Sequence, residues 1–462
     1  MSVVRTTFAN LCRVFAFVFA LICGATFAQA QDAGELSDYV LDTFGPAPLA
    51  PSGPLTDETR GALETIISYN IDQSGWDPAQ TAAFETIAEG RDPRVAWLLA
   101  DMLRFTWRPE FNGAIVQLAA QLLEIDFKTI RQRDEMLNHL IAWDIPAYPN
   151  YLSHKRRVLT NYVPGWERIL VQGDIDWRMV SWGGVNIDTR PHDATDEICD
   201  CIPAADNPKV SSANDADWLQ DDDIVFGITV NGESRAYPLR IMEVREMVND
   251  TLGGRELGIP YCSLCGAAQA YFTDGLPLGV KRPILRTSGL LIRSNKVMFD
   301  LETYSVFDTF LGKALTGPLA DIGLELEQAS VITTDWGAWK AQYPETTVLV
   351  EALALGRDFD LRNSRDAKGP IFPIGDVDPR LDVHEDVIGV VTGSGTPVAF
   401  ERSAAVLALQ HGAQVGFEDV QLILDAGGLR ALDTEGRDLG SHQAYWFAWS
   451  QFHPQTVLWS GP

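Results

Sequence analysis

The hydrophobic pattern of the chain changes from a helical to a β period, and this change limits the folds open to it. Leu63, Ile66 and Ile67 share one helical face, and similar patterns recur up to about residue 145. From Ile224 onward, short apolar runs alternate with turn residues, which is typical of strands. The sequence therefore predicts an α+β protein in which a helical N-terminal domain precedes a larger, predominantly β domain that carries a Cys-x-x-Cys loop.

Two sites in the first half carry the signature of a helix start. Asp77-Pro78 and Asp92-Pro93 each place a carboxylate that can cap backbone N–H groups before a proline at the first helical position. We expect short amphipathic helices that pack as an antiparallel bundle or as stacked hairpins. The helical pattern of apolar residues ends after Trp143, where prolines interrupt it, so we place a domain boundary near residue 175.

The first thirty residues resemble an export signal. Arg5 and Arg13 precede the apolar run Val14 to Cys23, and Ala28-Gln29-Ala30 is a small-x-small cleavage pattern. We therefore expect a periplasmic or secreted protein with no stable membrane insertion after the signal is removed. The predicted organisation is a signal peptide (1–30), an irregular leader rich in proline and glycine (31–54), a helical domain (55–175) and a β-rich domain (176–462).

The charge balance argues against one class of partner. The chain has 36 Lys and Arg against 63 Asp and Glu, a formal net charge of -27. Phosphate binding needs clustered Lys and Arg, so nucleic acid is an unexpected partner. An acid excess also keeps an exported protein soluble, without any binding role. In a scaffold role, the helical domain would supply the surface for a protein partner.

The β-rich half contains two similar hairpin patterns. The first consists of residues 224–230, the turn Asn231-Gly232 and residues 234–237, which predicts a type I′ hairpin. The second consists of residues 387–391, a turn at Gly395 and residues 398–400. Either a β-hairpin unit is duplicated within one domain, or a common hairpin pattern occurs twice.

Several sequence blocks occur together in the second half. They are Arg235–Leu239, Val248–Thr251, Gly253-Gly254, Tyr261–Cys265, Ser288–Leu291, Ser294-Asn295, Met298–Asp300, Trp446–Trp449 and Phe452–Pro454. In this order they resemble an uncharacterised bacterial and archaeal family, domain of unknown function 3179, from about residue 202 to the C-terminus. The resemblance implies membership of the family but supplies no settled activity. Two positions depart from the expected pattern: Arg245 stands in place of a histidine, and Ser263 in place of a proline.

The pair Cys262 and Cys265 is open to three chemical interpretations. A Cys-x-x-Cys dithiol can cycle through a disulfide, because the turn brings the sulfurs together and favours the first thiolate. The same two thiolates can bind zinc, copper or iron if further ligands complete the site. A structural disulfide is the third interpretation, since exported proteins form disulfides readily.

Other residues can complete a site around this pair. Cys199 and Cys201 could supply two more sulfurs for a four-cysteine metal site, or could form a second disulfide. Glu246, Asn249 and Asp250 precede the cysteine loop and are candidate catalytic groups, because a carboxylate beside a thiol or a bound water can act as a general base. Asn249 and Asp250 are also residue types that make tight turns.

These patterns favour an exported protein that binds a metal or acts in redox chemistry through its Cys-x-x-Cys site. The alternative is a non-catalytic binding or scaffold protein whose cysteines form structural disulfides. Whether the chain is an enzyme stays open. Among the histidines, His384 and His453 are candidates for remote ligands, although their spacing pairs them with no other histidine.

Overall fold

The computed structural model describes residues 37–72, 75–194, 199–351 and 370–461. The chain forms a short unit that ends at Gly45 and a main unit that begins at Pro46. The predicted signal peptide lies outside the described residues. Within the predicted irregular leader, α1 (Asp38–Phe44) is a helix, whereas residues 46–54 contain neither helix nor strand.

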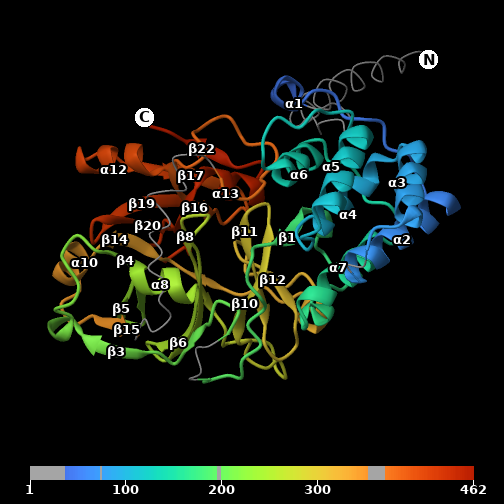
Figure 1. Cartoon of the computed structure of the whole chain (residues 1–462). Coiled ribbons are helices and arrows are strands. Elements are labelled where there is room, and N and C mark those ends of the chain that lie inside the picture. The colour runs from blue at the N-terminus through green and yellow to red at the C-terminus, as the bar shows by residue number, and fades with distance from the viewer. Residues whose placement is uncertain (1–36, 73–74, 195–198, 352–369, 462) are drawn as a thin grey trace, which may run out of the picture. The chain divides into compact units, whose positions relative to one another are not determined.

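The main unit begins with helices (Figure 1). They are α2 (Asp57–Asp72), α3 (Pro78–Gly90), η1 (Pro93–Val95), α4 (Ala96–Met102), α5 (Pro109–Leu123), α6 (Gln132–Ala142), α7 (Tyr151–Tyr162), η2 (Trp166–Arg168) and η3 (Trp177–Met179). Both predicted helix starts are confirmed: Asp77 caps α3 through a reciprocal capping box with Gln80, and Asp92 accepts a hydrogen bond from the backbone N–H of Arg94.

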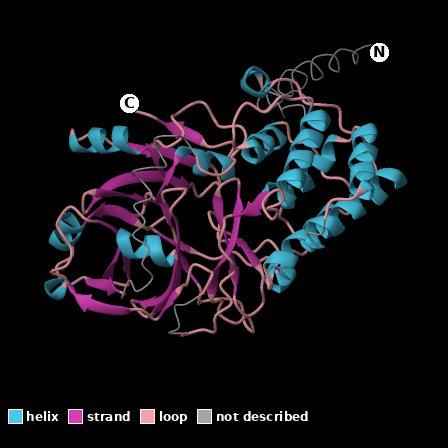
Figure 2. Ribbon diagram, in the orientation of Figure 1, coloured by secondary structure: helices cyan, strands magenta, loops and turns pink. Residues whose placement is uncertain are grey.

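The remaining described residues form five sheets (Figure 2). In pairing order, the first sheet consists of β1 (Val180–Trp182), β10 (Leu285–Ile292), β11 (Asn295–Asp300) and β12 (Val306–Asp308), and the second of β13 (Gln328–Ala329), β9 (Ala270–Phe272), β7 (Arg255–Cys262), β6 (Met247–Leu252) and β2 (Ala205–Asp206), with β8 (Ala267–Ala268) beside β7. The third sheet consists of β14 (Ile332–Asp335), β4 (Ile224–Val230), β5 (Glu233–Pro238), β15 (Thr347–Val350) and β3 (Lys209–Ser212). The fourth consists of β21 (His442–Tyr445), β16 (Asp386–Val391), β17 (Pro397–Glu401) and β22 (Val457–Trp459), and the fifth of β18 (Val415–Phe417), β19 (Val420–Asp425) and β20 (Gly428–Leu432).

Short helices connect these strands. They are η4 (Ala213–Asp215), α8 (Leu239–Arg245), α9 (Gly317–Asp321), α10 (Trp336–Gln342), α12 (Arg402–Gln410) and α13 (Trp446–Phe452). The predicted α+β class is therefore confirmed, with a helical region first and a larger sheet-rich region after it. Within the described ranges, no helix has both the length and the apolar character needed to cross a membrane.

The helical region is joined to the sheets by buried polar contacts. Trp166 donates its indole N–H to the carbonyl oxygen of Ser288 on β10, at 2.8 Å. Lys155 on α7 donates to the carbonyl oxygen of Val180 on β1, at 2.6 Å, and forms an ion pair with Asp101. Because Lys155 is fully buried, these oxygens replace the water that its ammonium group would otherwise need.

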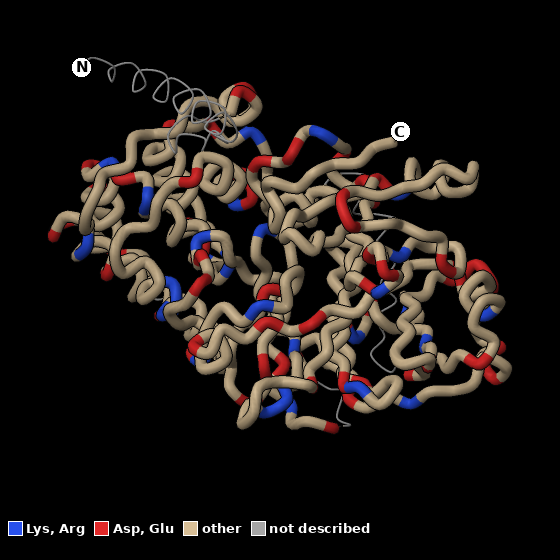
Figure 3. Tube along the Cα trace, turned by 180° about the vertical axis from the view of Figure 1, so that it is seen from behind, with Lys and Arg blue, Asp and Glu red and all other residues tan. Residues whose placement is uncertain are grey.

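In the view of Figure 3, basic residues are scattered among the acidic ones along the trace.

The two predicted hairpins belong to a repeated structural unit. The first copy consists of β4, β5 and α8, followed later by β14, α10 and β15; the second consists of β16, β17 and α12, followed by β21, α13 and β22. Both copies have the same sheet order, β14-β4-β5-β15 and β21-β16-β17-β22, and in both the last strand pairs in parallel. The duplication of a hairpin is confirmed, and the repeated unit extends well beyond the hairpin.

Each copy carries its own insertion between the helix and the third strand. Residues 246–331 of the first copy contain β6 to β13 and the cysteine loop, and residues 411–441 of the second contain β18 to β20. In each copy, the third and fourth strands therefore follow the insertion in the chain.

The two copies share one packing arrangement at the centre of the hairpin. Gly227 on β4 faces the ring of Trp339, and Gly389 on β16 faces the ring of Trp449. Both indole N–H groups donate to a threonine hydroxyl at 2.9 Å, Thr346 in one copy and Thr456 in the other. Sequence carries this signal, because Trp-Gly-Ala-Trp at 336–339 and Trp-Phe-Ala-Trp at 446–449 are each followed by proline and threonine at the same spacing.

Candidate functional site

The Cys-x-x-Cys pair closes a tight hairpin between β7 and β8. Cys262 is the last residue of β7 and pairs with Ala267 of β8, while Cys265 lies in the turn and donates its backbone N–H to the carbonyl oxygen of Cys262. The two sulfur atoms are 2.08 Å apart, which is disulfide-bonding distance. Both side chains are buried, and on one side they pack against the aromatic residues of α13.

A cavity of about 220 Å³ opens beside Cys262. Its apolar wall is formed by Leu264, Leu290, Leu291 and Phe372, and its polar wall by Ser263, Glu246 and Lys296. Cys262 lines the cavity, whereas Cys265 is not among the described residues that line it.

Glu246 and Lys296 form a buried ion pair in the cavity wall. Lys296 Nζ lies 2.8 Å from Glu246 Oε2 and donates to the carbonyl oxygen of Glu246 at 2.6 Å. Ser263, between the two cysteines, donates its hydroxyl to Glu246 Oε1 at 3.1 Å. Burial lowers the pKa of Lys296, and the carboxylate of Glu246 partly offsets this effect.

The backbone of Glu246 explains how its side chain reaches the cavity. Glu246 follows the last residue of α8 with a φ of 49°, in the left-handed region that side chains other than glycine seldom adopt. Its backbone N–H donates to the carbonyl oxygen of Met242, and its carbonyl oxygen accepts from the N–H of Tyr261 on β7. The chain thus reverses sharply from α8 into β6, which directs the carboxylate toward the cysteine loop.

Asn249 and Asp250 do not line this cavity. They are adjacent on β6, so their side chains point to opposite faces of the sheet. Asp250 accepts hydrogen bonds from Arg235 at 2.6 Å and from the hydroxyl of Tyr237 at 2.7 Å. Asn249 bonds both the N–H and the C=O of Leu285, which fastens β10 to β6. Of the three predicted catalytic residues, only Glu246 lies beside a cysteine.

Asn249 also belongs to a buried charge network near the other cysteines. Its amide donates to Asp206, which accepts two hydrogen bonds from Arg286 at 2.8 and 2.5 Å. Burial raises the pKa of Asp206, but the hydrogen bonds and charge of Arg286 outweigh this effect and lower it overall. Asp188, which is completely buried, lies 3.6 Å from the Nε atom of Arg286.

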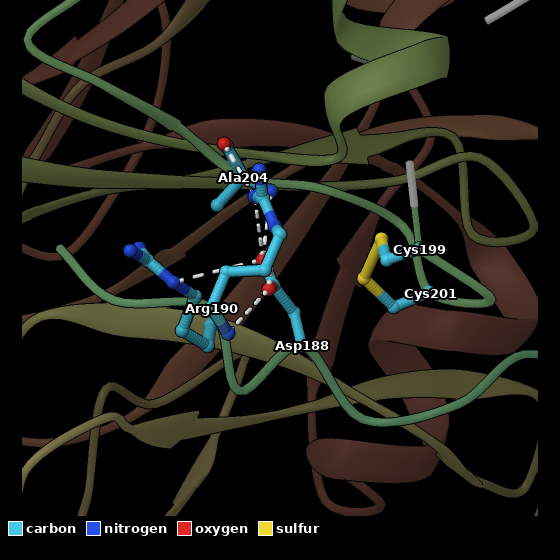
Figure 4. Close-up of a disulfide and its surroundings, with 6 residues drawn as sticks. Asp188, Arg190, Cys199, Cys201 and Ala204 are labelled. Carbon is cyan, nitrogen blue, oxygen red and sulfur yellow. Dashed lines mark hydrogen bonds and ion pairs between the residues drawn. A yellow bond between two sulfur atoms is a disulfide. The ribbon is translucent and has the colours of Figure 1, made fainter. Parts of the chain in front are cut away.

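Asp188 organises the loop that carries Cys199 and Cys201 (Figure 4). It accepts hydrogen bonds from Arg190 Nε at 2.8 Å and from the backbone N–H of Ala204 at 2.9 Å. The sulfur atoms of Cys199 and Cys201 are 2.07 Å apart, again disulfide-bonding distance. The four cysteines of the predicted metal site therefore form two separate pairs, Cys199 with Cys201 and Cys262 with Cys265. Among the described residues, no group of three or more His, Cys, Asp and Glu side chains could hold a metal ion.

Sequence reasoning missed Lys296, Arg286 and Asp188. The position of Lys296 in the sequence could have indicated its role, because a lysine within the apolar strand 295–300 must find a buried partner or reach solvent. The departure at Arg245 has a structural explanation, since its guanidinium donates to Glu351 at 2.7 Å in a buried ion pair.

The cysteine loop, Glu246 and Lys296 all lie in a segment shared with a known family. The sequence profile of a family described as "Protein of unknown function (DUF3179)" matches residues 199–442, more than half of the chain. The chain belongs to this family. The match includes both cysteine pairs and ends before α13. No curated protein and no solved structure matches the chain.

Proposed function

We propose that Cys262 and Cys265 form a redox-active disulfide that exchanges with a dithiol substrate bound in the adjacent cavity. The observation that carries this proposal is the position of Cys262, which lines a cavity together with the Glu246–Lys296 ion pair. Buried structural disulfides need neither a cavity at one sulfur nor charged groups beside it. The export signal pattern in the first thirty residues supports a periplasmic or secreted location, where disulfides persist.

The exchange has two steps, and both balance. A substrate thiolate attacks the sulfur of Cys262, the bond between the two cysteines breaks, and Cys265 leaves as a thiolate that takes up a proton. The second substrate thiolate then attacks the substrate sulfur of the mixed disulfide and releases Cys262. Overall, two electrons and two protons pass from the substrate dithiol to the cysteine pair. Lys296 stabilises the thiolate of Cys262, and Glu246 orients Lys296.

A thiol titration tests the proposal. We expect dithiothreitol to reduce Cys262–Cys265 while the protein stays folded, and we expect the oxidised protein to convert a reduced model dithiol peptide into its disulfide. Cys262→Ser should abolish this conversion, while the matched double variant Cys199→Ser/Cys201→Ser should retain it. If the Cys262–Cys265 pair is reduced only when the protein unfolds, the disulfide is structural and the scaffold alternative holds. Zinc, copper or iron retained by the reduced protein would instead support metal binding.

Two substitutions at the ion pair should change thiol reactivity in opposite directions. Lys296→Met is expected to slow alkylation of reduced Cys262 at pH 7 by roughly tenfold, because the cation that favours the thiolate is lost. Glu246→Gln should accelerate the same reaction, because it removes a carboxylate whose negative charge disfavours a nearby thiolate. The measurement is the rate of iodoacetamide labelling of reduced protein followed by mass spectrometry. Equal rates in the wild type and both variants would remove the ion pair from the mechanism.

A further inference from the structure

A second, larger cavity lies between the second copy of the repeat and the insertion of the first copy. Its volume is about 620 Å³, and its walls include His442 on β21, together with Trp449 and His453 at the end of α13. Phe310 and Phe452 stack on each other in the wall with ring centroids 4.5 Å apart. The cavity therefore has aromatic walls and two imidazole rings.

The protein itself occupies both ring nitrogens of His442. Gln328 Nε2 lies 2.9 Å from Nδ1, and the side-chain amide of Gln269 lies 3.3 Å from Nε2. A neutral imidazole carries one N–H, so it can accept from one amide only and must donate to the other. The atom that faces His442 is Gln269 Nε2, while Gln269 Oε1 is buried without a partner among the described residues, so turning this amide by 180° gives the ring N–H its acceptor. His442 is therefore a structural residue of the cavity wall.

His453 differs, because its ring has no such partners. It is 8% exposed, lies against the indole of Trp449 at 4.1 Å between ring centroids, and lines the cavity. Within the described ranges, no hydrogen bond joins its ring to a side chain or to the backbone. Burial lowers the pKa of His453 to about 4, so at pH 7 the ring is neutral and presents one acceptor nitrogen. The ring nitrogens are not among the buried side-chain atoms that lack a hydrogen-bond partner, so they are accessible from the cavity.

The first copy shows how the equivalent surface is covered. Tyr343 occupies the position of His453, and its hydroxyl donates to Asp425, the last residue of β19, at 2.7 Å. Thr334 on β14, the counterpart of β21, donates to the carbonyl oxygen of Ala426 in the turn between β19 and β20. Gly428 at the start of β20 packs on Ile332 of β14. The insertion of the second copy thus covers this surface of the first copy, whereas the matching surface of the second copy lines the 620 Å³ cavity together with residues of the first copy's insertion.

The charged side chains of the lining are acidic. Among the described residues that line the cavity there is no Lys or Arg, whereas the exposed residues Glu325 and Glu327 both line it, and Glu327 also lies 3.6 Å from Arg255. Aromatic faces attract ammonium groups, and the acid excess of the chain draws cations toward its surface. We propose that this cavity binds a small arylalkyl amine in its ammonium form, which donates a hydrogen bond to His453 while its ring packs against Phe452, the half-buried aromatic residue of the lining.

Calorimetric titration with phenethylamine tests the site, with phenylacetate and phenethyl alcohol as probes of the same shape but different charge. We expect the amine to bind and the anion not to bind. His453→Phe should weaken amine binding by roughly tenfold or more, because it removes the acceptor but keeps an aromatic ring against Trp449. His453→Gln, which restores an acceptor, should recover part of the affinity. Tyr343→Phe is the matched control in the first copy and should leave binding unchanged.

Three outcomes would overturn the proposal. The first is no heat of binding with the amine up to about 10 mM, the weakest affinity expected for a ligand of this size. The second is equal affinity for amine and phenylacetate, which would remove the role of charge. The third is unchanged affinity in His453→Phe, with that variant shown to be folded by its circular dichroism spectrum.

Discussion

Replacing Arg286 with methionine is expected to lower the free energy of unfolding by about 3 to 5 kcal/mol. Arg286 is completely buried, donates two hydrogen bonds to Asp206 and lies beside the equally buried Asp188. Methionine fills similar space but leaves two carboxylates in the interior without this cation. Removing one partner of a buried ion pair costs far more than the pair itself contributes, because the remaining charge stays out of water.

Urea unfolding at pH 7 measures this effect, and the chain provides a control for it. Arg437 pairs with Asp433 at 2.6 Å, but its side chain is 71% exposed, so Arg437→Met should cost less than about 1 kcal/mol. Asp206→Asn added to Arg286→Met should recover part of the lost stability, because it removes one of the unpaired carboxylates. Similar losses for Arg286→Met and Arg437→Met would show that the network does not hold its charges away from water.

Alanine at either repeated glycine is expected to destabilise the protein by about 3 kcal/mol. A Cβ atom at Gly389 would lie 2.1 Å from the ring of Trp449, and one at Gly227 would lie 2.1 Å from the ring of Trp339. Neither ring can easily move, because both are buried and both indole N–H groups are bonded to threonine hydroxyls. The two substitutions should therefore have effects of similar size, as expected for two copies of one packing arrangement.

Thermal unfolding of Gly389→Ala and Gly227→Ala tests this expectation. Gly113, on the exposed side of α5, is a suitable control because a Cβ atom there meets no other atom within 4 Å. Gly113→Ala should raise stability by roughly 0.5 to 1 kcal/mol, since alanine favours the helix. A loss at Gly389 with none at Gly227 would mean that the two copies do not share the same packing constraint.

Local features were predictable because they depend on residues close together in the chain. Asn231 and Gly232 both have positive φ in the turn between β4 and β5, as a type I′ hairpin requires. Asp77 caps α3 because its side chain needs only the N–H of Ala79, two residues on.

The candidate site was predictable only in part. Glu246 was expected near the cysteine loop and lines its cavity, but Asn249 and Asp250 were grouped with it on the basis of sequence distance alone. On a strand, adjacent side chains diverge, so sequence proximity was a poor guide for these two residues. Lys296 and Arg286 were missed because their partners, Glu246 and Asp206, lie 50 and 80 residues away.

By itself, the sequence determined the helix starts, the two hairpins, the α+β order and the cysteine loop, because each depends on contacts over a few residues. Only the tertiary structure decided which charges meet in the interior and which surfaces stay open. The pairing of Lys296 with Glu246 requires β11 to lie beside the end of α8, and the cavity at His453 forms where the insertion of the first copy meets the second copy. Such contacts depend on how distant strands are ordered in the sheets, which local patterns do not encode.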